Sequence, residues 1–144
     1  MLKSNGINRI IDANINRLKE GLRVCEEISR FIMNDRKLTV QFKKTRHSLD
    51  SLACRLAPIA QRLRGRKSLK DVGKNVHLET ELKRNDLADI FYANIQRVKE
   101  STRVLEEFAK LKRSSEALGF KKIRYEIYEL EKKVITKLPC LRRT

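Results

Sequence analysis

The chain has 144 residues, with 34 Lys and Arg against 18 Asp and Glu, so its formal charge is +16 at pH 7. A chain of this length can bury one hydrophobic core without disulfide or metal crosslinks, and we expect a single domain over 1–144. Five Gly and two Pro leave few tight turns, which argues against a barrel or sandwich of many short strands.

The sequence indicates neither a membrane-spanning segment nor a metal site. No segment of the sequence approaches the roughly 18 apolar residues of a membrane span, and residues 1–17 lack a continuous apolar signal core. We therefore expect a cytoplasmic protein without membrane contact. The cysteines Cys25, Cys54 and Cys140 are far apart and form no C-x-x-C pair, which favours neither a disulfide framework nor a zinc site.

The first half of the chain predicts a helical hairpin. Apolar residues recur at helical spacing from about 7 to 34, at Ile11, Ile15, Leu18, Leu22, Cys25, Ile28 and Ile32. Asn34 and Asp35 offer a break and a new N-cap. The pattern then resumes and stops near Pro58, with Leu38, Phe42, Thr45, Leu49, Leu52 and Leu56 on the apolar face.

The second half predicts another hairpin after a basic linker, 57–86. Residues 65–84 show no sustained period and are interpreted as a long loop. Asn85 or Asp86 can cap a third helix, and Ser114 with Ser115 opens a fourth. The apolar residues of these helices are Leu87, Ile90, Phe91, Ile95, Val98, Leu105, Phe108, Leu111, Phe120, Ile123, Ile127, Leu130 and Val134.

The two halves are copies of each other. Residues 13–30 read ANINRLKEGLRVCEEISR and residues 93–110 read ANIQRVKESTRVLEEFAK, with identity at 10 of 18 positions. FKKTRH at 42–47 matches FKKIRY at 120–125. The duplication predicts an all-α, up-down helical bundle in which hairpin 8–56 is repeated as hairpin 87–134.

Polar residues are repeated together with the apolar ones. Asn14, Arg17 and Glu20 recur as Asn94, Arg97 and Glu100. On a helix, Asn14 and Arg17 lie at one border of the apolar face, where a side chain is held by its neighbours and still reaches a ligand. A structural alternative is that Arg17 with Glu20, and Arg97 with Glu100, form ion pairs one turn apart.

Two further arginines, Arg46 and Arg124, lie beside the apolar faces of the second and fourth helices. We expect these two to converge with Arg17 and Arg97 on phosphate oxygens, because the guanidinium fork matches phosphate geometry. The alternative for each arginine is to cover the core while its charged end stays in water.

Positive charge is concentrated between residues 36 and 70, which hold eleven basic residues and one acidic residue, Asp50. Such a field attracts nucleic acid, an acidic membrane or nucleotide phosphates, unless it is simply solvated surface. Within the loop KDVGKN at 70–75, Lys70, Asp71 and Gly73 could cradle a phosphate with Mg²⁺. A simple Asp-x-Gly turn explains them equally well.

Several segments together resemble a known family: DANINRLKEGLRV at 12–24, DVG at 71–73, RNDLAD at 84–89, ANIQRVKESTRVLEE at 93–107 and RYEIYELE at 124–131. They are similar to the small hydroxymethylpyrimidine phosphate kinases of thiamine synthesis, which stand alone or are fused ahead of thiamine phosphate synthase. The resemblance implies transfer of the ATP γ-phosphoryl group to hydroxymethylpyrimidine phosphate. Because no synthase segment follows in the sequence, we expect a stand-alone form here, and the resemblance allows thiamine phosphate synthase as a partner.

For that reaction we assign roles on physical grounds. Catalysis is expected from Arg17, Arg97, Glu20 and Glu100, with Arg46, Arg124, Lys70 and Gly73 also binding phosphate. Mg²⁺ is expected on Glu20, Glu100 or Asp71, and Asn14 or Asn94 is expected to bind the aminopyrimidine. ATP and Mg²⁺ are therefore the expected cofactors, and a homodimer is left open. The alternatives are a basic nucleic-acid-binding bundle, although no recognition motif is present, and a scaffold module.

Overall fold

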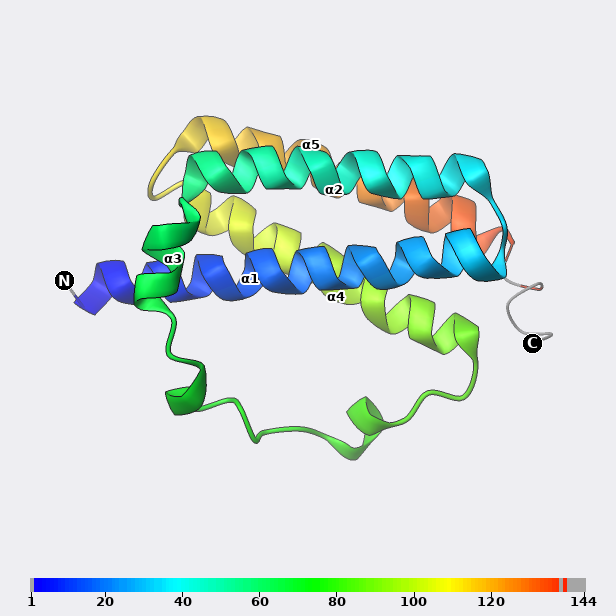
Figure 1. Ribbon diagram of the computed structural model, residues 1–144, viewed down its shortest axis with the longest axis horizontal. Helices are drawn as coiled ribbons and strands as arrows, with labels where there is room; N and C mark the ends of the chain where they lie inside the picture. The colour runs from blue at the N-terminus through cyan, green and yellow to red at the C-terminus, as the bar shows by residue number, and fades with distance from the viewer. Residues whose placement is uncertain (1, 138, 140–144) are drawn as a thin grey trace.

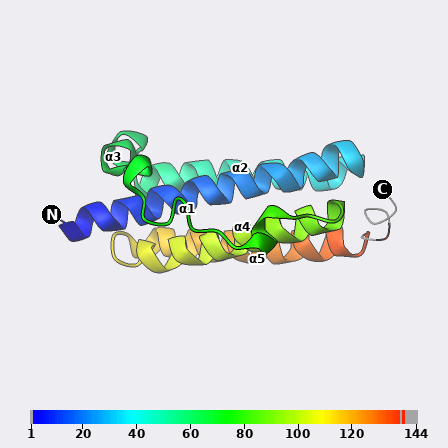
Figure 2. The same ribbon diagram turned by 90° about the horizontal axis from the view of Figure 1, so that it is seen from below.

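A computed structural model describes residues 2–137 and 139, and no strand occurs among them. Four long helices form an up-down bundle (Figure 1): α1 (Leu2–Glu27), α2 (Arg36–Leu56), α4 (Leu87–Ala109) and α5 (Ser114–Ile135). Helix α1 packs against α4, and α2 packs against α5. The hairpins α1–α2 and α4–α5 lie side by side when the bundle is seen from below (Figure 2). The predicted all-α bundle is confirmed.

Two aspartates set where α2 and α4 begin. Asp35 Oδ1 accepts a hydrogen bond from the backbone N–H of Leu38 at 2.9 Å, and this bond is the first cause of the lowered pKa of Asp35. At the start of α4, Asp86 Oδ1 accepts from the N–H of Asp89 at 2.8 Å. Asp86 rather than Asn85 is therefore the N-cap, and both caps satisfy backbone donors that a helix start leaves free.

The first helix differs from the predicted span of 7–34. It already begins at Leu2, and its α-helical part ends at Glu27. The chain continues as one wider π-helical turn, Ile28–Ile32, in which the Ser29 hydroxyl donates to the carbonyl of Cys25 at 3.0 Å. A π turn preserves much of the apolar spacing, which is why periodicity alone did not reveal it.

The linker 57–86 is not entirely loop, which corrects the prediction. It contains a short helix, α3 (Ile59–Gly65), and two single 3₁₀ turns, η2 (Ser68–Lys70) and η3 (Glu79–Leu82). Helix α3 buries Arg62 and Gly65 against the bundle, whereas Ile59 and Leu63 are more than half exposed. A helix that turns its apolar residues outward gives no amphipathic signal in the sequence.

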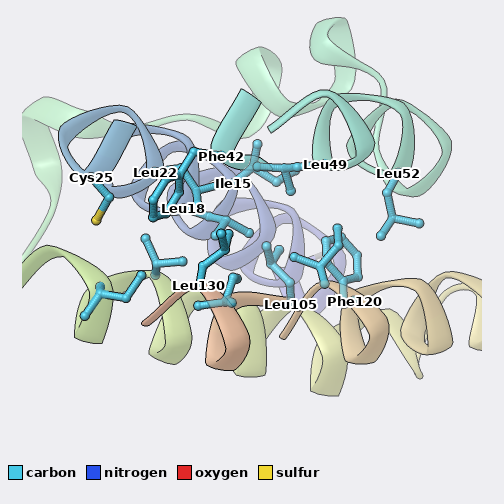
Figure 3. Close-up of a cluster of buried hydrophobic side chains, with 14 of the residues drawn as sticks. Ile15, Leu18, Leu22, Cys25, Phe42, Leu49, Leu52, Leu105, Phe120 and Leu130 are labelled. Carbon is cyan, nitrogen blue, oxygen red and sulfur yellow. The ribbon is translucent and has the colours of Figure 1, made fainter. Parts of the chain in front are cut away.

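All four long helices contribute to one core. The side chains that converge in its centre are completely buried (Figure 3): Ile15, Leu18, Phe42, Leu105 and Phe120.

None of the described helices combines the length and the hydrophobicity that a bilayer span requires.

The cysteines occupy unlike environments. Cys25 lies in the core, and its burial raises the pKa of the thiol to about 12. Cys54 is exposed on α2, and Cys140 falls outside the described residues.

Candidate functional site

A groove of about 560 Å³ runs between the outer face of α1 and the segment 66–71 that follows α3. The segment leaves α3 and passes below α1 in Figure 1, and it crosses in front of α1 in Figure 2. The polar residues that line the groove are Arg9, Asp12, Asn14, Asn16, Arg17, Arg66, Lys67, Ser68 and Asp71. Four of them are cations and two are carboxylates, so the groove carries an excess of positive charge.

Asp12 is the buried acid of this groove, with a side chain only 5% exposed. It accepts two hydrogen bonds from Arg66, at 2.7 Å from Nε and 2.8 Å from Nη2. These bonds raise the pKa of the Arg66 guanidinium. Arg62 on α3 lies beside the same carboxylate, with its Nε 3.9 Å from Asp12 Oδ1. Two arginines thus share one carboxylate, and the cluster remains positive.

Asn14 and Arg17 stand together in the groove. The Asn14 amide donates to the carbonyl of Ile10 at 2.8 Å, and its oxygen accepts a long hydrogen bond from Arg17 Nη1 at 3.4 Å. Arg17 is exposed and forms no ion pair with Glu20 among the described residues, so the structural alternative for this pair is wrong. The guanidinium therefore keeps most of its donors available to a ligand.

The repeated residues of α4 do not line this groove. Asn94 repeats the anchoring of Asn14, since its amide donates to the carbonyl of Ile90 at 2.8 Å. Arg97 is exposed, and within the described chain it pairs with no carboxylate, Glu100 included. Glu100 borders a separate groove of about 550 Å³ between α4 and α5, where it accepts from Gln96 at 3.4 Å.

The two repeats differ at the position two residues before Asn14 and Asn94. Asp12 of the first repeat corresponds to Tyr92 of the second, which is partly exposed. In the described part of the chain, the acid–arginine pair that borders Asn14 therefore has no copy beside Asn94.

Arg46 and Arg124 do not converge with Arg17 on one site, which corrects the expected set of four arginines. Arg46 Nη2 donates to Glu26 Oε2 at 3.2 Å, and Arg124 Nε donates to Glu106 Oε2 at 3.0 Å. Both glutamates are buried and join the two helices of a hairpin. Arg124 also contacts Tyr128, and this hydrogen bond is the first cause of its raised pKa.

Glu26 and Glu106 are functional residues of the hairpins that were not predicted, although the sequence contains a signal for them. The pair of glutamates at 26–27 recurs at 106–107, within the repeated segment that also contains Arg23 and Arg103. Exposed glutamates have no packing reason to be copied in pairs. In each pair the first glutamate is buried, and the second is largely exposed.

The predicted loop at 70–75 forms a turn. Asp71 Oδ1 accepts from the backbone N–H of Gly73 at 2.8 Å, and all residues of the loop are exposed. Asp71 lines the groove, whereas Lys70 and Gly73 do not.

Asp71 is the residue of the groove that could bind Mg²⁺. The described residues contain no group of three or more His, Cys, Asp or Glu side chains placed to hold a metal ion. Mg²⁺ bound with nucleotides needs fewer, since phosphates and water supply most of its ligands and one or two carboxylates the rest. Asp71 lines the groove and forms no ion pair among the described residues, so it fits that requirement. Glu20 and Glu100 lie outside the groove.

Fold and groove define the class: a small, strongly basic helical bundle built on a repeated hairpin, with a cationic groove on its first helix. One known protein family matches most of the chain. The chain belongs to the ThiD2 family, which matches residues 9–133.

Its curated relatives are longer proteins. The chain is 40% identical over 136 residues to a thiamine-phosphate synthase of Rhodopirellula baltica, covering 92% of this chain and 36% of the relative. It is 39% identical to a thiamine-phosphate synthase of Synechocystis sp., covering 87% and 35%, respectively. The chain thus spans about a third of these relatives, whose names connect the family with thiamine biosynthesis. No solved structure matches it significantly.

Proposed function

We propose that this protein is an ATP-dependent kinase that phosphorylates hydroxymethylpyrimidine phosphate to the diphosphate, in thiamine biosynthesis. One observation carries the proposal: the cationic groove in which Arg17, Arg66 and Lys67 surround Asn14 and Asp71. The family membership supports the pathway, and the resemblance of the repeated segments supports the kinase reaction.

The reaction requires charge neutralisation more than acid–base chemistry. An oxygen of the acceptor phosphate attacks the γ-phosphorus of ATP, the bond to the β,γ-bridging oxygen breaks, and ADP leaves. The attacking oxygen is already ionised near neutral pH, so no strong general base is needed. Two polyanions must approach each other, and this is the task for which a groove with Arg9, Arg17, Arg66 and Lys67 is suited.

Within this proposal, Arg17 binds the phosphate of the acceptor and Asn14 lies where its amide can meet the aminopyrimidine. Asp71 would hold Mg²⁺ together with the phosphates, and the ion would neutralise charge on them. Arg97, Glu20 and Glu100 do not line the groove, and we propose for them only a secondary role, on the strength of their repetition. Arg46 and Arg124 are assigned to the structure of the hairpins instead.

The names of the relatives raise a second possibility, namely that this third of their length takes part in the synthase reaction itself. A cationic groove suits the phosphorylated substrates of either reaction, and the resemblance of the repeated segments favours the kinase. A synthase assay on the isolated chain separates the two: we expect no thiamine phosphate to form without added synthase.

The kinase proposal predicts a strong preference for a phosphorylated acceptor. We expect kcat/KM for hydroxymethylpyrimidine phosphate to exceed that for the free alcohol by roughly 10⁴-fold, because a bound acceptor displaces water from the arginines of the groove and the free alcohol gives them no anion in exchange. The measurement compares both acceptors at one fixed Mg-ATP concentration. Values within about tenfold of each other would contradict the role given to the arginines.

Two further outcomes point to the other classes of protein. Tight, steeply salt-dependent binding to any DNA duplex, without kinase activity, would indicate a nucleic-acid-binding bundle. The absence of any thermal shift with Mg-ATP and with the pyrimidine phosphate would indicate a scaffold module.

A further inference from the structure

We propose that Asp12 is the positioning residue of the groove: through Arg66 it fixes the segment 66–71 against α1, and it thereby makes the first repeat the half that binds the phosphorylated acceptor. This inference rests on the proposed function for the identity of the acceptor. The fixing of the segment can be tested without it.

The geometry of the pair supports this role. Arg66 is the first residue after α3, and it is followed directly by Lys67 and Ser68, which line the groove. Its guanidinium binds both oxygens of Asp12 at 2.7 and 2.8 Å, an arrangement that fixes orientation as well as distance. From Arg66 to Asn85, every residue is exposed. The Asp12–Arg66 pair is thus the strong side-chain tie between the segment 66–71 and the bundle.

Asp12 is also placed so that it does not cancel the charge of the groove. Its carboxylate is shared by Arg66 and by the buried Arg62, whose Nε and Nη1 have no hydrogen-bond partner within the described residues. The negative charge is therefore more than balanced locally. Arg9, Arg17 and Lys67 remain to attract an anion.

The duplication supplies an internal comparison. Asn14 and Arg17 have counterparts on α4, but Asp12 is replaced there by Tyr92. Neither Asn94 nor Arg97 lines the groove of the first repeat or the groove between α4 and α5. Asp12, which the second repeat lacks, therefore lies in the half at which the segment is anchored.

The experiment uses two variants, Asp12→Asn and Arg66→Lys. The second changes the exposed partner of the pair: it keeps the positive charge but cannot form two parallel hydrogen bonds to the carboxylate. The matched control is Glu116→Gln. Glu116 is similarly buried and pairs with Arg55 at 3.2 Å, but this pair joins α5 to α2 away from the groove. Two assays are used: the rate of tryptic cleavage after Lys67, Lys70 and Lys74, and the steady-state kinetics, kcat and KM, with hydroxymethylpyrimidine phosphate.

In both variants we expect cleavage at these lysines to accelerate by about fivefold or more while the helical circular dichroism is retained. We expect KM to rise by about tenfold with kcat changed by less than about threefold, since a released segment weakens binding before it affects the chemical step. The control should change neither quantity.

Unchanged cleavage and KM in Asp12→Asn and Arg66→Lys would overturn the inference, and so would equal changes in Glu116→Gln. The cleavage measurement needs no substrate. If the wild type fails to phosphorylate the pyrimidine phosphate, the proposed function is lost, but accelerated cleavage in the two variants still establishes the positioning role.

Discussion

At the scale of single residues, the repeated polar side chains divide into two groups with different tasks. Glu26 and Glu106 are buried and accept from arginines of the neighbouring helix, so they join the helices of each hairpin. Arg17 and Arg97 are exposed and have no carboxylate partner among the described residues. An arginine that is repeated without a structural partner is the better candidate for ligand binding.

Replacement of Arg17 should reduce activity without unfolding the protein. We expect Arg17→Ala to lower kcat/KM for the pyrimidine phosphate by at least about tenfold, or about 1.4 kcal/mol, with the thermal midpoint near that of the wild type. Because the groove lies on the first repeat, we expect Arg97→Ala to lose less than about threefold. Equal losses in both variants would assign the site to both repeats.

Replacement of Glu106 should destabilise the protein. Glu106→Gln leaves Arg124 beside a neutral partner in a buried position, and we expect a loss of about 3 kcal/mol in the free energy of unfolding. The control is Glu107→Gln, since Glu107 is exposed and pairs only with surface cations, and its expected loss is below about 0.5 kcal/mol. Urea denaturation measures both. A Glu106 variant as stable as its control would refute the structural role.

At the scale of elements, the close approach of α1 and α4 depends on Gly21. A Cβ at this position would lie 2.6 Å from Val98 Cγ2 and 3.1 Å from the carbonyl oxygen of Asn94. The side chain of Val98 is β-branched and has little rotameric freedom in a helix, so the helices themselves would have to separate. The equivalent position of the second repeat holds Ser101, which is buried and donates to the carbonyl of Arg97 at 2.7 Å.

Two glycines of α1 should therefore respond in opposite directions to the same substitution. We expect Gly21→Ala to destabilise the protein by about 1–3 kcal/mol through overpacking, in spite of the better helix propensity of Ala. Gly6→Ala, with no atom within 4 Å of the added Cβ, should be neutral or stabilising by up to about 1 kcal/mol. Thermal or urea unfolding of both variants gives the comparison, and a stabilising Gly21→Ala would show that the helices adjust freely.

At the scale of the whole molecule, the net charge of +16 is the dominant electrostatic feature. The cations of the segment 70–84 extend into solvent, and those of the groove lie close together on one side of α1. Like charges at these densities repel one another in the folded state, and salt screens the repulsion. Ion pairs such as Lys19 with Asp50, at 2.8 Å, are weakened by the same screening.

Repulsion should outweigh the ion pairs. Raising KCl from about 0.02 to about 0.2 M should increase the thermal midpoint by about 2–4 °C, because the screening length falls below the spacing of most surface charges. Inorganic phosphate at equal ionic strength should raise it further, since an anion bound in the groove stabilises the folded state. A midpoint that falls with KCl would mean that the ion pairs dominate.

The bundle could be predicted from local chemistry along the chain, because the apolar spacing of the two hairpins and the capping residues at 34–35 and 85–86 are visible in the sequence. The duplication likewise pointed to Asn14 and Arg17. Which residues meet in space depended on the packing of the helices: α3 buries an arginine and a glycine instead of its apolar residues, and Arg46 and Arg124 are bound by buried glutamates. The pairing of Asp12 with Arg66 joins positions 54 residues apart. Such contacts depend on how the helices pack, and periodicity along one helix does not contain that information.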